Sequence, residues 1–173
     1  MVERQVYKPN EYLTDDKEKK LSPVIFLAGP IQGCEDWQKE AIEIISNLAK
    51  DIIIASPRRD NISEKFVFEA QMDWETYHLR RAGGKGVVMF WLAKETEHAC
   101  NRAFAQTSRF ELAEWKRNHE ANGVKLVLGI EPGFTGERYI KRRFLQDCQE
   151  VLIFDNLKDT CNEAIRQTLE GKQ

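Results

Sequence analysis

The sequence lacks several features that would indicate particular classes of protein. Its 26 basic and 28 acidic side chains leave a formal net charge of only −2, which argues against a surface built to bind nucleic acid. Its four cysteines are scattered and include no C-x-x-C pair, so we expect free thiols and a reducing compartment. No apolar run approaches the length of a membrane span, and the first residues contain no apolar secretion-signal segment. We therefore expect a cytoplasmic protein that binds neither nucleic acid nor membrane.

The histidines and glycines also lack the spacing of familiar metal and nucleotide motifs. His78, His98 and His119 form no H-E-x-x-H motif and no ligand set with the cysteines, which predicts that no metal is bound. The turn at residues 29–33 matches neither the G-x-G-x-x-G fingerprint nor the G-K-[ST] of a phosphate-binding loop. It has no serine- and threonine-rich phosphate loop, and no acidic pair follows the first apolar run. These absences disfavour a flavin protein and a receiver domain.

What the sequence does contain is an alternation of short apolar runs and amphipathic segments. The apolar runs predict strands at residues 23–28, 52–55, 87–92, 125–130 and 151–154. The amphipathic segments predict helices at about residues 36–49, 66–82, 108–121 and 137–146, and a last helix that ends near residue 171. This alternation predicts an α/β fold: a doubly wound, flavodoxin-like or Rossmann-like parallel sheet of five strands, with helices on both faces.

The beginning of the chain differs from the rest in composition. Residues 1–20 are polar, and we expect a mostly solvated arm with a short ordered piece around Tyr7 and Tyr12. Residues 21–173 show no internal repeat and no linker, which indicates one domain.

In the predicted sheet, all turns that lead from a strand into a helix lie at one edge, where α/β proteins bind their ligands. Gly29, Pro30 and Ile31 form the first such turn, either as a simple tight turn or as a place where the backbone approaches a ligand. Arg58 and Arg59 follow the second strand, either as a solvated pair or as a bidentate site for phosphate or carboxylate.

The second predicted helix carries a mixed face at this edge. Its members share helical spacing and are Gln71, Trp74, Glu75, His78 and Leu79. The mixture of a carboxylate, an amide and an indole indicates a pocket wall, in which Gln71 and Trp74 are expected to bind the substrate. Polar residues at the rim of a core would give the same pattern. His78 by itself is better explained as a structural histidine than as a base.

Glu111 has two competing interpretations. Ser108 and Glu111 have the S-x-x-E spacing of a capping box, in which the serine caps the helix and the glutamate bonds back to it. Alternatively, Glu111 and Glu75 converge on one pocket, and two carboxylates are the minimal set for cleaving a glycosidic bond. A place in the first turn of a helix would favour the ionised form of Glu111, which suits a nucleophile.

Four stretches resemble the nucleoside 2-deoxyribosyltransferase family, and more closely its divergent "nucleoside 2-deoxyribosyltransferase-like" branch. They are Ile25–Pro30, the Trp74-Glu75-x-x-His78-Leu79 segment, the aromatic strand at residues 87–92, and Ser108–Leu112. The resemblance covers about residues 23–147, and the order and spacing of the stretches are more specific than any one of them.

The resemblance implies a flavodoxin-like fold and cleavage of the N-glycosidic bond of a 2′-deoxynucleoside or its 5′-monophosphate. The deoxyribosyl group would pass to another base or to water, with no cofactor, in a homodimer or higher homo-oligomer. The family nucleophile falls on Glu111, the acidic residue that handles the base on Glu75, and the sugar-holding turn on residues 29–31. Ser108 is the nearest counterpart of a serine that contacts the 5′-phosphate.

Further expectations concern the substrate's base and phosphate. Aromatic side chains are expected to surround the base, namely Trp74, Trp91 and Phe134. Arg58, Arg59 and Ser108 are the candidates for a phosphate. Two other classes stay open: a non-catalytic nucleotide-binding module on the same fold, and a flavodoxin-like or receiver-like interaction domain.

Overall fold

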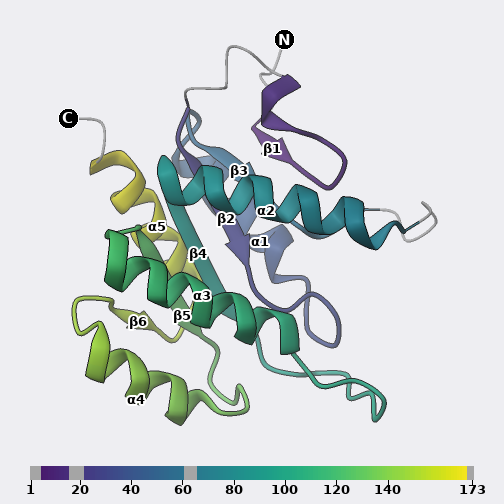
Figure 1. Cartoon of the computed structure of the whole chain (residues 1–173), viewed down its shortest axis with the longest axis vertical. Helices are drawn as coiled ribbons and strands as arrows, with labels where there is room; N and C mark the ends of the chain where they lie inside the picture. The colour runs from purple at the N-terminus through teal and green to yellow at the C-terminus, as the bar shows by residue number, and fades with distance from the viewer. Residues whose placement is uncertain (1–4, 16–21, 61–65, 171–173) are drawn as a thin grey trace.

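The structure is a computed structural model that describes residues 5–15, 22–60 and 66–170 (Figure 1). Its centre is a parallel sheet of six strands in the order β1-β3-β2-β4-β5-β6. The strands are β1 (Val6–Tyr7), β2 (Val24–Ala28), β3 (Ile53–Ala55), β4 (Gly86–Leu92), β5 (Leu126–Ile130) and β6 (Ile153–Phe154). From β3 to β6 this is the strand order of the flavodoxin-like fold, so the predicted fold class is confirmed.

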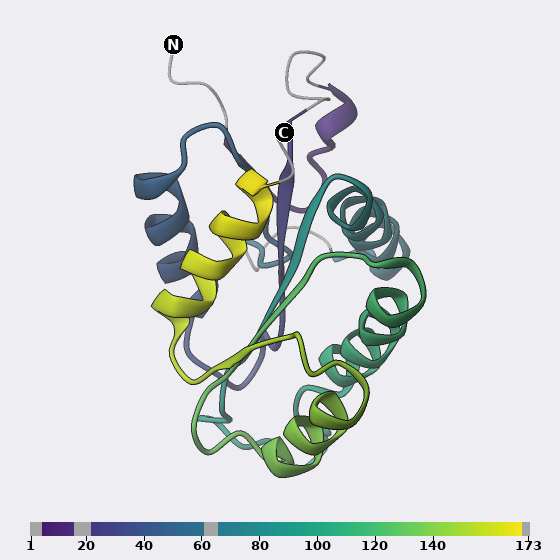
Figure 2. The same cartoon turned by 90° about the vertical axis from the view of Figure 1, so that its left-hand side faces the viewer.

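Helices cover both faces of the sheet, as Figure 2 shows edge-on. They are α1 (Trp37–Leu48), α2 (Phe68–Gly84), α3 (Gln106–Asn122), α4 (Glu137–Asp147) and α5 (Leu157–Glu170), and a short 3-10 helix, η1 (Leu13–Asp15), precedes them. Helices α1 and α5 pack on one face, and α2, α3 and α4 pack on the other. The predicted helices and strands agree with these bounds to within about two residues.

The core forms two layers because successive side chains of a strand point to opposite faces of the sheet. In β2, Phe26 packs in the layer that contains Trp74 of α2, whereas Leu27 packs in the layer that contains Trp37 of α1. Every residue of β2 and β5 is buried, which explains why these strands are continuous apolar runs in the sequence. The sheet is therefore a rigid base for the loops at its carboxyl edge.

The sixth strand corrects the prediction of five. Val6 and Tyr7 pair in parallel with Ile54 and Ala55, and Tyr7 is only 1% exposed. The ordered piece expected around Tyr7 and Tyr12 is thus present, but its pairing as a strand of the sheet was not predicted. A two-residue strand shows no periodicity in the sequence, and its pairing depends on the otherwise open edge of β3. Residues 1–4 and 16–20 of the predicted arm lie outside the described residues.

Candidate active site

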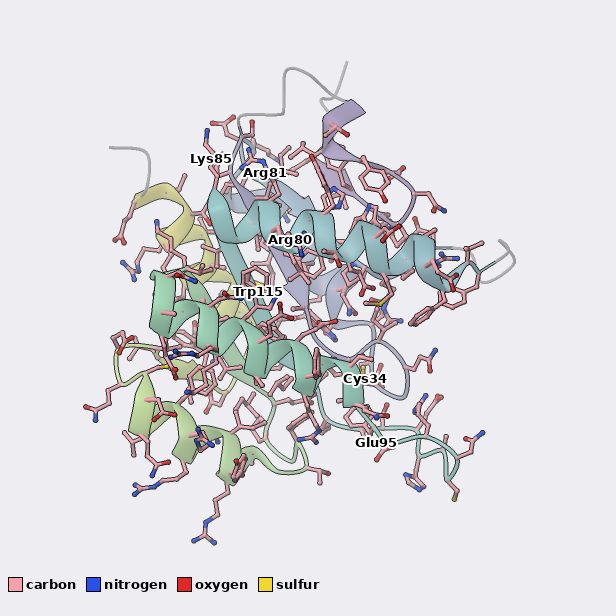
Figure 3. All side chains as sticks on the ribbon, in the orientation of Figure 1. Cys34, Arg80, Arg81, Lys85, Glu95 and Trp115 are labelled. Carbon is pink, nitrogen blue, oxygen red and sulfur yellow. The ribbon has the colours of Figure 1, made fainter. Side chains whose placement is uncertain are left out.

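Loops from the ends of successive strands meet at the carboxyl edge of the sheet. The loop after β2 and the loop after β4 are in contact, because Thr96 N–H donates to the Gly33 carbonyl at 2.8 Å. Arg102 of the second loop donates to the Gln32 side chain of the first at 3.2 Å. Figure 3 shows Cys34 and Glu95 of these loops near the start of α3, and Lys85 at the opposite end of the molecule.

Helix α3 begins two residues earlier than predicted, and this excludes the capping box. Ala105 is the N-cap residue in a left-handed conformation with φ 55°, and it makes no side-chain capping bond. Ser108 is therefore the third residue of the helix, and Arg109 N–H bonds to the Ala105 carbonyl at 3.0 Å. Glu111 lies in the second turn of α3, out of reach of the first free N–H groups. The capping interpretation of Glu111 is wrong.

Glu111 and Glu75 lie close enough for each charge to act on the other. Burial, followed by the charges of Glu75 and Glu114, raises the pKa of Glu111 to about 8. Burial also raises the pKa of Glu75, and a hydrogen bond from Gln71 opposes that rise. The structure therefore brings together the two carboxyl groups named from the sequence, one on α2 and the other on α3.

The expected ionisation of Glu111 by the helix N-terminus is wrong. The positive end of the helix dipole acts mainly within the first turn, and Glu111 lies beyond it. Desolvation and a like charge both favour the protonated carboxylic acid. At neutral pH Glu111 is accordingly largely protonated.

Gln71 connects Glu75 to the loop after β3. Arg59 Nε donates to Gln71 Oε1 at 3.1 Å, and Gln71 Nε2 donates to Glu75 Oε1 at 2.7 Å. The same Gln71 nitrogen donates to the Pro57 carbonyl at 3.1 Å. Gln71 was expected to bind the substrate, but its amide already has partners on both atoms, and the residue is 9% exposed.

The two arginines expected to bind phosphate differ in what they already contact. Arg58 forms an ion pair with Asp36 at 3.1 Å and donates to the Ile31 carbonyl at 2.9 Å. It also donates to the Gln38 side chain at 3.0 Å, so its guanidinium holds the loop after β2 in place. Arg59 uses only Nε among the hydrogen bonds found within the described residues, and its guanidinium lies 4.8 Å from the Phe66 ring centroid. Arg59 is thus the better candidate for an anion.

The first turn is fixed by packing on β4 and α1. Gly29 has φ +149°, and a Cβ there would collide with the Trp91 carbonyl and lie 2.9 Å from the Trp37 ring. Trp37 Nε1 donates to the Pro30 carbonyl at 2.8 Å, and the Ile31 carbonyl accepts from Arg58. These two carbonyls are therefore used within the chain, and the side chain of Ile31 is the half-exposed part of the turn.

The aromatic residues expected to surround a base lie in the core. Trp74 is fully buried against Phe26, and its Nε1 donates to the Glu11 carbonyl at 2.7 Å. Trp91 is 5% exposed and belongs to the layer under α1 and α5, opposite the face that carries α2 and α3. Phe134 is 1% exposed beneath the guanidinium of Arg109. All three rings are therefore largely enclosed by the core, and their contact with a base stays a prediction.

Two polar residues of α2 and α3 are also enclosed. His78 is fully buried, and its Nδ1–H donates to the Trp74 carbonyl at 2.9 Å, while burial lowers its pKa. This geometry favours the structural interpretation of His78. Ser108 is 3% exposed, and its contact with a phosphate stays a prediction.

Sequence reasoning missed a set of exposed apolar side chains that lie close in sequence to the two glutamates. Phe66, Phe68 and Met72 are 60%, 59% and 40% exposed at the start of α2, and Phe110 of α3 is 75% exposed. The signal was present, since Phe110 directly precedes Glu111 and Met72 directly follows Gln71. Large apolar residues that are exposed to solvent often mark a binding or association surface.

The described residues include no cluster of three or more acidic, histidine or cysteine side chains that could hold a metal ion. All four cysteines are free thiols. Burial raises the pKa of Cys34 to about 11, so this thiol near the site stays protonated at neutral pH. Within the same part of the chain, no helix is long and apolar enough to cross a membrane.

Comparison with known proteins identifies a family for this chain but no individual relative. A search of curated proteins finds no match to the chain. A family model described as "Nucleoside 2-deoxyribosyltransferase like" matches residues 22–129. The matched region contains the first turn, both glutamates, strands β2 to β4 and all but the last residue of β5. The chain therefore belongs to the nucleoside 2-deoxyribosyltransferase-like family.

Proposed function

We propose that this protein cleaves the N-glycosidic bond of a (deoxy)nucleoside or nucleoside 5′-monophosphate and transfers the deoxyribosyl group to another base or to water. The observation that carries the proposal is the pair of glutamates, Glu111 and Glu75, at the carboxyl edge of the sheet. Partial burial raises the pKa of both, which is typical of carboxyl groups that act in catalysis. Membership of the family supports a nucleoside as the substrate.

Glu111 is the proposed nucleophile and Glu75 the proposed acid. The carboxylate of Glu111 attacks C1′ while the bond from C1′ to the base nitrogen breaks, and protonated Glu75 gives its proton to the departing base. A second base or water then attacks C1′, Glu75 takes up the proton of this nucleophile, and the Glu111 carboxylate is released. One protonated and one ionised carboxyl group provide these two roles.

The protonation state of Glu111 in the free protein differs from the one that the reaction requires. Because the pKa of Glu111 is about 8, this residue is largely protonated at neutral pH. The reactive form has ionised Glu111 and protonated Glu75. Positive charge that develops on the sugar at the transition state stabilises the Glu111 anion, which favours the reactive form when it is needed.

The experiment is incubation with a panel of nucleosides and nucleotides, with released bases identified by mass. We expect Glu111→Gln and Glu111→Ala to lower the rate of base release by at least about a thousandfold with the fold intact. Glu43→Gln is the control, since Glu43 is an exposed glutamate on α1 at the opposite face of the sheet, and this variant should stay within a few-fold of the wild type. Unchanged turnover in both Glu111 variants would remove Glu111 from the mechanism. Ligand-dependent thermal stabilisation without base release would instead indicate a non-catalytic nucleotide-binding module.

A further inference from the structure

We propose that Gln71 is a positioning residue, not a substrate contact, and that it fixes which oxygen of Glu75 carries the transferable proton. The role in catalysis rests on the proposed function, whereas the effect on Glu75 itself does not. Gln71 reaches Glu75 because the two are four residues apart on α2 and therefore face each other on the helix surface.

The orientation of the Gln71 amide follows from its three partners. An arginine can only donate, so the atom that receives Arg59 Nε at 3.1 Å is the amide oxygen. The Pro57 carbonyl can only accept, so the atom 3.1 Å from it is the amide nitrogen. The two hydrogens of that nitrogen are then divided between Pro57 and Glu75, and the amide cannot flip without losing both bonds.

The hydrogen bond from Gln71 makes the two oxygens of Glu75 different. Oε1 accepts a hydrogen bond from Gln71 at 2.7 Å, so a proton on this carboxyl group belongs on Oε2. A donor also stabilises the ionised form and keeps the pKa of Glu75 below the value that burial alone would produce. Gln71 thereby prevents Glu75 from becoming so weak an acid that it no longer yields its proton.

The other charged groups around Glu75 do not replace this donor. Glu111 of α3 adds a like charge, and the charge of Glu114 acts on Glu111. Arg59 is occupied with the oxygen of Gln71 and lies against the Phe66 ring. His78, one turn later on α2, uses its Nδ1–H on the Trp74 carbonyl. Among the described contacts, the Gln71 amide is the donor that reaches the Glu75 carboxyl group.

The test is a carbon-detected NMR titration of the glutamate carboxyl groups in the full-length chain, without substrate. Gln71→Met keeps the length of the side chain and removes the donor, and we expect the pKa of Glu75 to rise by about one pH unit. The matched control is Gln38→Met, the same change at a glutamine that is 1% exposed on α1 and bonds to Arg58 and Pro30. In that variant Glu75 should titrate as in the wild type.

A measurement on the unmodified protein keeps the proposal testable if Gln71→Met does not fold. The side-chain N–H resonances of Gln71 should move with pH along the titration curve of Glu75. Gln71 resonances that ignore the titration, or an unchanged pKa of Glu75 in folded Gln71→Met, would overturn the proposal. If the wild type releases no base from any nucleoside, only the proposed function fails. If it is active, the alkaline limb of kcat/KM should move to higher pH in Gln71→Met.

Discussion

At the scale of single residues, Glu111 shows that a side chain's chemistry is set by what surrounds it. The spacing from Ser108 to Glu111 is the same in a capping box and in this structure, where no cap is formed. Burial and the Glu75 charge give Glu111 a high pKa that no local motif predicts. Trp74 shows the same dependence in a different way. The sequence places it on a helix face that mixes polar and apolar residues, but the structure buries it in the core.

The raised pKa of Glu111 predicts a loss of stability at alkaline pH. The folded protein holds the proton up to about pH 8, whereas an unfolded glutamate releases it near pH 4.5, so stability falls as pH rises through this range. Glu111→Gln cannot ionise, and we expect it to be more stable than the wild type at pH 9 by roughly 1–3 kcal/mol after allowance for solvent screening.

Urea unfolding of the two proteins at pH 5 and pH 9 measures this difference. At pH 5 both carry a neutral side chain at position 111, so their unfolding free energies should be close. Glu43→Gln again serves as the control, because Glu43 is exposed on α1 at the opposite face of the sheet. An equal difference between Glu111→Gln and wild type at both pH values would contradict the assigned pKa.

At the scale of elements, the start of α3 decides where Glu111 lies. The loop after β4 ends at Ala105, whose φ of 55° turns the chain directly into the helix. Among the described residues other than glycine, only Asn10 and Ala105 have positive φ. An alanine in this conformation is strained, because its Cβ approaches the backbone.

Replacing Ala105 by glycine should relieve this strain at the start of α3. We expect Ala105→Gly to raise the unfolding free energy by about 0.5–1 kcal/mol, since glycine adopts positive φ without strain. Thermal unfolding should show an increase of about 1–4 °C. Ala103→Gly, two residues earlier and without positive φ, should lower stability or leave it unchanged. A loss of stability in Ala105→Gly would show that the left-handed start of α3 is not adopted.

At the scale of the whole molecule, four large apolar side chains are exposed on or just before the two helices that carry the glutamates. Phe66 lies just before α2, Phe68 begins it, Met72 lies one turn before Glu75, and Phe110 directly precedes Glu111. Exposed apolar side chains of this size favour association with another protein surface. The family resemblance implies a homo-oligomer, and we expect these side chains to contact the neighbouring subunit.

We accordingly expect a homodimer or higher homo-oligomer in solution, measurable by light scattering after size-exclusion chromatography. Phe68→Ser with Phe110→Ser should shift the protein toward monomer at a given concentration. Leu152→Ser is the control, because Leu152 is equally exposed at 62% but precedes β6 at the far edge of the sheet. A wild-type protein that remains a monomer at high concentration would contradict the expectation.

Much of the fold was predictable because its signals are local. The runs at residues 24–28 and 126–130 are buried on both faces, so their apolar character appears directly in the sequence. The position of Glu75 and Glu111 near one edge followed from the rule that parallel strands end together. Strand β1 escaped prediction because it is two residues long and depends on pairing with β3.

The sequence by itself determined the order of strands and helices, the edge at which loops meet, and the two glutamates there. Only the tertiary structure decided that Arg58 is occupied by Asp36, that Trp74 is held by the carbonyl of Glu11, and that Gln71 contacts Glu75. The periodicity of apolar residues depends on neighbours along the chain, and it can therefore be read from the sequence. Burial, hydrogen bonding and pKa depend on neighbours in space, and Trp74 and Glu11 lie 63 residues apart in sequence.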